Sequence, residues 1–109
     1  MIDIEKALER INNDLGTPHL NSKDVDDPTN PYESIIQKVA QYIETLIPHK
    51  IQKLSQILYR VDISEAKTQA AFDLGKTHLA ARNLAELIVE RSLQKLKTQQ
   101  EYKKSQDFE

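Results

Sequence analysis

Residues 58–67 read LYRVDISEAK, and the fold class of the chain depends on how this stretch is interpreted. Its centre, residues 60–64, alternates polar and apolar side chains, which is the pattern of a half-buried β-strand. A strand here would also bring an arginine, an aspartate and a serine together as candidate catalytic groups. The alternative interpretation is a joint between two helices.

The residues that precede this stretch favour the joint. Leu58 and Val61 continue a stripe of apolar residues, three and four positions apart, that begins upstream, as in a helix with one buried face. No other segment of the chain alternates convincingly. A strand would therefore have no partner, and its buried backbone groups would remain unpaired at a considerable cost in free energy.

The residues that follow the joint predict the start of another helix. Asp62 is followed three positions later by Glu65, which is the spacing of a capping box, and Ser64 is a second possible cap. We therefore predict a tight helix–helix joint over residues 61–64, with Ile63 directed back into the core.

Helical signals also organise the chain before the joint. A first helix is expected over residues 3–15, ended by Gly16, where a positive φ is needed. The second helix has the clearest start, with Asn30 as its cap and Pro31 at its first position. Pro48 is expected to break or kink the chain, because it cannot donate a helical hydrogen bond. A third helix then leads into the joint.

Two more helices are expected after the joint. The fourth covers residues 64–74, and Gly75 separates it from a long last helix over residues 78–102. The residues of the last helix that are expected to face the core are Leu79, Leu84, Leu87, Ile88 and Leu96. Alanines and other apolar residues widen this arc, which predicts contact with more than one neighbouring helix. Tyr59 is expected at the rim of the core.

The composition fits a small all-α protein. The chain has 109 residues, 39% hydrophobic and 29% charged, with only two glycines, which is a globular balance with few turn residues for an all-β fold. We expect one helical domain over residues 1–109, a bundle of four or five helices with a long C-terminal helix. Residues 17–29 form a long loop in this interpretation, and residues 97–109 project or fray.

Polar residues around the joint are the candidate site. Arg60 and Asp62 would meet Glu90 and Arg91 if the last helix packs across the joint, and Lys95 lies one helical turn beyond Arg91. These five residues could form an interaction surface, a buried acid–base site, or an ion-pair network that fixes how two helices meet. The ion-pair network is favoured, because no nucleophile motif accompanies the cluster.

No other pattern predicts catalysis, a metal site or a cofactor. His19, His49 and His78 are too far apart for two of them to share a helix face as metal ligands. The acidic run over residues 24–27 lacks the glycine and the glutamate of a calcium-binding EF-hand loop. There is no glycine-rich phosphate loop. We expect no enzymatic activity.

Charge and composition bear on partners and location. Residues 1–45 carry a net charge of −5 and residues 46–109 a net charge of +3, which suggests internal pairing, dimer pairing or an external partner. The absence of cysteine and of a membrane-spanning run favours a cytoplasmic protein without membrane contact. The favoured function is a protein–protein interaction module, with self-association through the last helix as one form.

Nucleic-acid binding is the alternative function. Residues 91–104 hold five Lys or Arg residues against one Glu, and such a run could contact phosphates. The isoelectric point of about 5.9 is not that of a strongly basic domain, and no recognition helix stands out. A partner-facing or solvated helix end is therefore the preferred interpretation of this segment.

Overall fold

The computed structural model describes residues 3–17, 20–27 and 29–106, with side chains up to Tyr102. Its helices are α1 (Ile4–Leu15), α2 (Pro31–His49), α3 (Ile51–Val61), α4 (Glu65–Phe72) and α5 (Thr77–Gln106), with a short 3-10 turn, η1 (Ser22–Asp24). The described residues contain no strand. The predicted all-α bundle with a long C-terminal helix is confirmed, and the strand interpretation of residues 60–64 is wrong.

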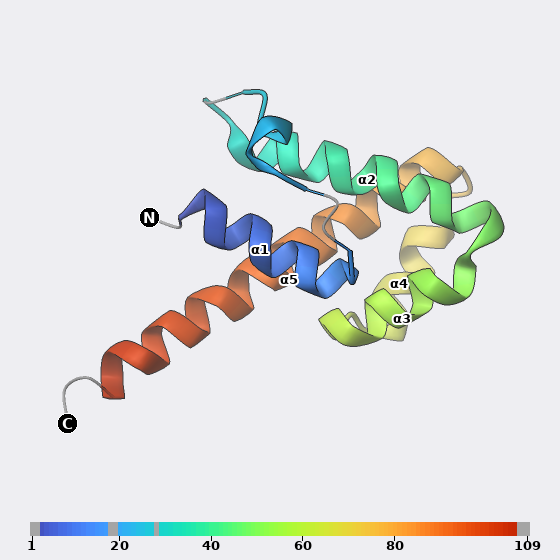
Figure 1. Cartoon of the computed structure of the whole chain (residues 1–109). Coiled ribbons are helices and arrows are strands. Elements are labelled where there is room, and N and C mark those ends of the chain that lie inside the picture. Colours follow the sequence, from blue (N-terminus) through green and yellow to red (C-terminus); the bar gives the residue numbers. More distant parts are fainter. Residues whose placement is uncertain (1–2, 18–19, 28, 107–109) are drawn as a thin grey trace.

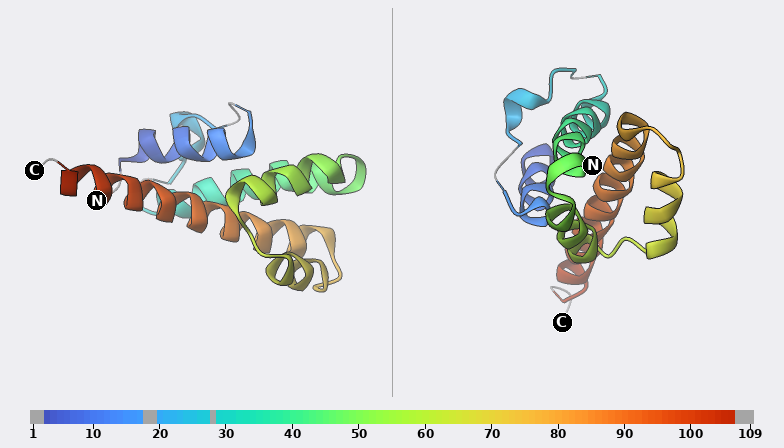
Figure 2. Two further views of the ribbon diagram at one scale, coloured as in Figure 1. Left: turned by 90° about the horizontal axis from the view of Figure 1, so that it is seen from below. Right: turned by 90° about the vertical axis from the view of Figure 1, so that its right-hand side faces the viewer.

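Helix α5 is the axis of the molecule. It packs most extensively against α2 and also contacts α1, α3 and α4, so its wide apolar arc is shared among four neighbours, as predicted. Figure 2 shows α4 at one edge of the bundle and α1 on the opposite side of α5. At about 1.5 Å per residue, the 30 residues of α5 exceed the length of its partners, and its C-terminal end extends past them (Figure 1).

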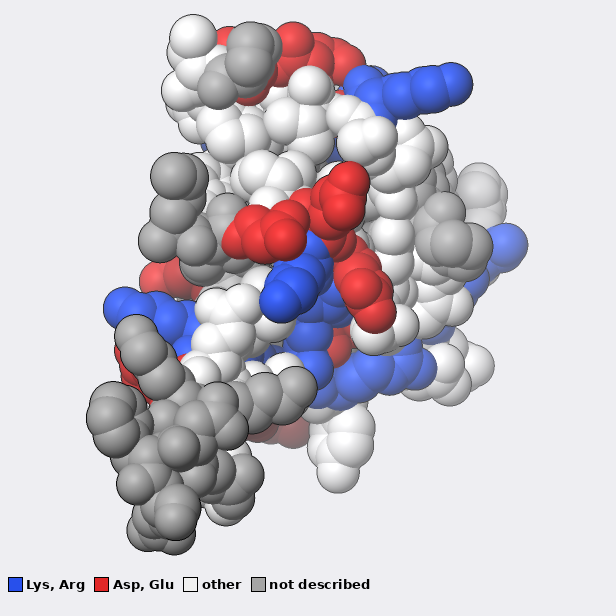
Figure 3. Space-filling view, turned by 60° about the vertical axis from the view of Figure 1, so that its left-hand side comes forward, with Lys and Arg blue, Asp and Glu red and all other residues white. Residues whose placement is uncertain are grey.

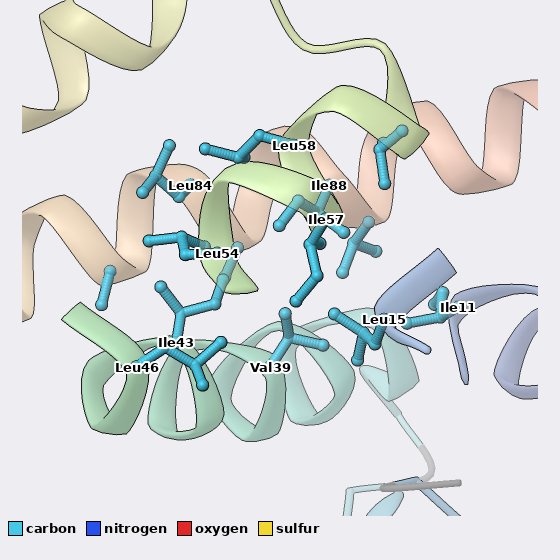
Figure 4. Close-up of a cluster of buried hydrophobic side chains, with 14 of the residues drawn as sticks. Ile11, Leu15, Val39, Ile43, Leu46, Leu54, Ile57, Leu58, Leu84 and Ile88 are labelled. Atoms are coloured by element: carbon cyan, nitrogen blue, oxygen red, sulfur yellow. The ribbon is translucent and has the colours of Figure 1, made fainter. Parts of the chain in front are cut away.

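The core is built from the predicted apolar stripes. Leu15 of α1 lies beside Val39 of α2, and Ile43 of α2 lies beside Leu54 of α3 (Figure 4). The stripe of α5 closes the cluster, with Leu84 fully buried. The prediction is wrong for one residue that was expected in the core. Leu79 is 41% exposed, because it lies in the first turn of α5, near the end of the bundle.

Helix α2 includes Pro48, so the predicted break or kink comes just after this residue and not at it. The helix ends at His49, and the chain turns at Lys50, whose N–H donates to the carbonyl of Leu46 at 2.7 Å. A proline near the end of a helix removes one hydrogen bond, but the turn after it can still close. Ile47 therefore belongs to α2.

The long loop between α1 and α2 is anchored at both of its described ends. The side-chain amide of Asn12 donates to the carbonyl of Leu20 at 2.7 Å and accepts from its N–H at 2.8 Å, and Leu20 is buried. Farther on, the hydroxyl of Ser34 accepts a hydrogen bond from the backbone N–H of Asp27 at 3.2 Å. Polar side chains of α1 and α2 thus hold this loop against the bundle.

An ion-pair network joins α2 to α5. The guanidinium of Arg82 donates two hydrogen bonds to the carboxylate of Glu33, at 2.8 and 2.7 Å, and a third to Glu86 at 2.7 Å. These hydrogen bonds from Arg82 hold the pKa of Glu33 below its ordinary value of 4.5. Glu33 also lies in the first turn of α2, where its backbone N–H donates to the cap Asn30.

The depressed pKa of Glu33 predicts a specific loss of stability in acid. A carboxyl with a lowered folded-state pKa stabilises the fold above its unfolded-state pKa, and the contribution is lost as pH falls through the lower value. Glu33→Gln is therefore expected to flatten the fall in stability below about pH 4.5. Urea unfolding of both proteins at several pH values measures this, with Glu44→Gln, an exposed position on the same helix, as the control. Parallel curves for wild type and Glu33→Gln would contradict the assignment.

Candidate functional site

The joint after α3 is a left-handed turn. Asp62 has φ 69°, and the backbone N–H groups of Asp62 and Ile63 donate to the carbonyls of Tyr59 and Leu58, at 3.1 and 2.9 Å. This pair of hydrogen bonds is the Schellman arrangement that closes a helix C-terminus. The joint is therefore as tight as predicted, and Ile63 packs half-buried against the core.

Ser64, and not Asp62, caps the next helix. The hydroxyl of Ser64 accepts a hydrogen bond from the backbone N–H of Lys67 at 3.2 Å, so the second possible cap is the one in use. The prediction of a capping box from Asp62 to Glu65 is wrong. Aspartate is favoured both at helix caps and, among non-glycine residues, in left-handed turns, and the spacing alone does not separate the two roles.

Two of the predicted site residues connect the joint to α5. The guanidinium of Arg91 lies 3.5 Å from the carboxylate of Asp62, and the ammonium of Lys95 donates to the backbone carbonyl of Arg60 at 3.1 Å. Glu90 lines the same groove as Asp62 and Arg91. These contacts hold the C-terminal end of α3 against the middle of α5.

The fifth predicted residue, Arg60, turns its side chain away from this group. Its guanidinium donates to the backbone carbonyl of Asp14 at 3.0 Å, at the end of α1. It also lies where a side chain on Gly16 would be, because a Cβ built there comes within 2.8 Å of its Nη1 atom. The five residues thus surround the joint, but the charged groups do not converge on one point.

A buried polar contact next to this region was not predicted. The carboxylate of Asp14, in α1, accepts a hydrogen bond from the hydroxyl of Ser92, in α5, at 2.7 Å, and both residues are buried. Arg10 lies 3.4 Å from the same carboxylate. One signal was available: Asp14 and Ser92 fall three or four positions from buried isoleucines, Ile11 and Ile88, on the same helix faces.

The groove between the joint and α5 has a mixed lining. It has a volume of about 270 Å³, and its lining includes the charged residues Asp62, Lys67, Glu90 and Arg91 and the half-buried Ile63 and Leu87. The lining thus includes two acids and two bases, and Asp62 and Arg91 already pair with each other. The arrangement is suited to holding helices together, since opposite charges neutralise one another across it.

A second groove lies between α3 and α4. It has a volume of about 400 Å³ and is lined by Leu58, Tyr59 and Ile63 on one side and by Glu65, Thr68 and Gln69 on the other. Tyr59 is 88% exposed, so its predicted place at the core rim is wrong. The buried stripe of α3 runs through Leu54, Ile57, Leu58 and Val61, and Tyr59 projects from the outer face.

On the face shown in Figure 3, acidic and basic side chains lie next to one another and are not separated into two patches. A groove between α1 and α5 includes Lys6, Glu9, Arg10, Leu96 and Gln99. Two of the five basic residues of the C-terminal segment, Arg91 and Lys95, are engaged at the joint. Lys97 is exposed, and the side chains of Lys103 and Lys104 lie outside the described residues.

The described residues contain no group of three or more His, Asp and Glu that could hold a metal ion, while His19 lies outside them. None of the described helices combines the length and the apolar character needed to cross a bilayer. Comparisons with protein-family models, with curated proteins and with solved structures find no match for this chain.

Proposed function

We propose that this chain is a non-enzymatic, intracellular interaction module that binds a helix of a partner protein in the groove between α3 and α4. The observation that carries the proposal is Tyr59, which stands 88% exposed at the edge of that groove. Tyrosine is enriched at protein interfaces because its ring buries a large area while its hydroxyl stays hydrogen-bonded.

The outer face of α3 extends the apolar surface beyond Tyr59. Ile51 is 47% exposed, and Ile51, Ser55 and Tyr59 follow each other at four-residue steps along one face of α3. The groove continues across Leu58 and Ile63 to the polar side chains of α4. An apolar strip with a polar wall suits an amphipathic helix, which lays its apolar face into such a groove.

The arc of α5 supports self-association less well. Its apolar side chains between Ala80 and Leu96 are mostly covered by the other four helices of the same chain. After Leu96, the large apolar side chain that the structure describes is Tyr102, and it is 65% exposed. The exposed large apolar side chains of α3 are Tyr59 and Ile51, at 88% and 47%, and those described on α5 are Tyr102 and Leu79, at 65% and 41%.

Photo-crosslinking in the cells of origin tests the proposal. A photo-reactive phenylalanine analogue at position 59 of the full chain is expected to give one discrete adduct, identified by mass spectrometry. The same analogue at position 102, an exposed tyrosine outside the groove, is the matched control and is expected to give none.

Sedimentation equilibrium at about 100 μM, where micromolar complexes are populated, distinguishes a second copy from another protein as the partner. A dimer that Tyr59→Glu dissociates and Tyr102→Glu leaves intact would assign the groove to self-association. A monomer that also gives no adduct from position 59 would overturn the proposal.

A further inference from the structure

Helix α4 is held to the rest of the molecule differently from every other helix. Ala71 is its one fully buried side chain, and Thr68 and Phe72 are half-buried, while the other five residues are exposed. Phe72 packs against the core with part of its ring, but one alanine and a half-buried phenylalanine contribute less apolar area than the four buried apolar side chains that anchor each of α2 and α3. The packing that attaches α4 to α5 is correspondingly weak.

Polar contacts show the same contrast. Asp14 links α1 to α5 through Ser92, Glu33 links α2 to α5 through Arg82, and the Arg60 carbonyl links α3 to α5. The hydrogen bonds of the α4 side chains are local, to its own cap Ser64 and to Asp73. Among the described side chains, none joins α4 to another helix by a hydrogen bond or an ion pair.

A residue in the left-handed conformation lies three positions before the start of α4, and another lies three positions after its end. Asp62 precedes it with φ 69°, and Gly75 follows it with φ 83°. A Cβ built on Gly75 meets no atom within 4 Å, so the glycine is required by the backbone conformation and not by a close neighbour. Positive φ at a non-glycine residue such as Asp62 carries a conformational cost that is released when the turn opens.

Grooves border α4 on two sides. One separates it from α3, and the other lies between its first turn and the middle of α5. A helix of 8 residues is shorter than the roughly 12–15 residues that an isolated helix needs to be even marginally stable in water. If α4 leaves α5, its backbone hydrogen bonds are therefore expected to break.

We propose that α4 opens from α5 as a unit between hinges at Asp62 and Gly75, while α1, α2, α3 and α5 stay folded. Such opening makes α4 the movable wall of the groove that it shares with α3, so that the groove can widen to admit a helix. The role in binding rests on the proposed function; the opening itself does not.

Hydrogen exchange of the full chain, followed by NMR without any partner, tests the opening. Amides in the second half of α4, from Gln69 to Phe72, are expected to exchange at least about 100-fold faster than amides at the centre of α2. Their rates should also be insensitive to low concentrations of urea, because local opening exposes little surface. Equal protection of α4 and α2, with equal dependence on urea, would overturn the proposal.

Two glycine variants sharpen the test. Gly75→Ala disfavours the closed turn and is expected to accelerate exchange in α4 by about 5-fold while leaving α2 unchanged. The matched control is Gln41→Gly, which weakens α2 at an exposed position and should leave α4 exchange unaltered. Acceleration of α4 exchange by Gln41→Gly would mean that α4 exchanges only through global unfolding.

The exchange and crosslinking experiments can reject the opening of α4 and the binding function independently of each other. Fast local exchange in α4 together with no adduct from position 59 would retain the hinge motion and reject the binding function. An adduct from position 59 together with slow, globally coupled exchange would retain the binding function with a rigid groove.

Discussion

Replacing Leu84 with alanine is expected to lower the free energy of unfolding by about 2–5 kcal/mol. Leu84 is fully buried in the cluster where α5 faces the other helices, so the substitution removes apolar contacts and leaves a cavity that the surrounding helices fill only in part. Urea unfolding followed by circular dichroism measures the change, with an unaltered dependence on urea if both proteins unfold in two states.

Leu79→Ala is the matched control, since it makes the same chemical change five positions earlier in the same helix. Leu79 is 41% exposed, and substitutions at such sites usually change stability by no more than about 0.5 kcal/mol. Both variants remove the same atoms from a leucine side chain, so the difference between them chiefly reports the difference in burial. Similar losses at the two positions would show that the first turn of α5 is covered in solution.

This pair of leucines marks how far periodicity can predict a core. Both occur in the apolar pattern of the last helix, and the pattern correctly predicts that this helix meets several neighbours. Periodicity gives the direction in which a side chain points, but not how far the neighbouring helices extend along the axis. Leu79 belongs to the apolar pattern of α5 but is exposed because the neighbouring helices do not cover the first turn of α5. Tyr59 is exposed because its side chain points away from the buried stripe of α3.

At the joint, too, one feature was predictable from the sequence and another was not. The approach of a helical stripe from one side and a cap from the other was enough to predict the turn and to exclude a strand. The left-handed backbone of Asp62 was not predictable, since an aspartate three residues before a glutamate also fits an N-cap. The structure assigns the cap to Ser64 and leaves Asp62 to close α3.

The candidate site was predictable as a neighbourhood and not as a set of contacts. Asp62 and Arg91 do meet, as expected from a last helix that crosses the joint. Arg60 bonds instead to a carbonyl 46 positions away, at the end of α1. A contact of that sequence separation depends on the packing angle of α1, for which the sequence of a single chain provides no local signal.

The close approach of Arg60 to Gly16 leads to the second large expected effect. Gly16→Ala should lower the free energy of unfolding by about 1.5–3 kcal/mol, combining left-handed backbone strain with a lost hydrogen bond. Gly16 has φ 74° and closes α1, and its new Cβ would lie 2.8 Å from Nη1 of Arg60. The flexible guanidinium can move aside, but only by leaving the carbonyl of Asp14.

Gly75→Ala and a double-mutant cycle separate these two contributions. Gly75 has a similar φ, but open space where a Cβ would be, so its replacement should cost only the backbone strain, about 1 kcal/mol. In an Arg60→Met background, Gly16→Ala should likewise cost about 1 kcal/mol, because the displaced hydrogen bond is already absent. If Gly16→Ala costs the same with and without Arg60, then the guanidinium does not occupy this position in solution, and the contact between α3 and the end of α1 is weaker than its geometry indicates.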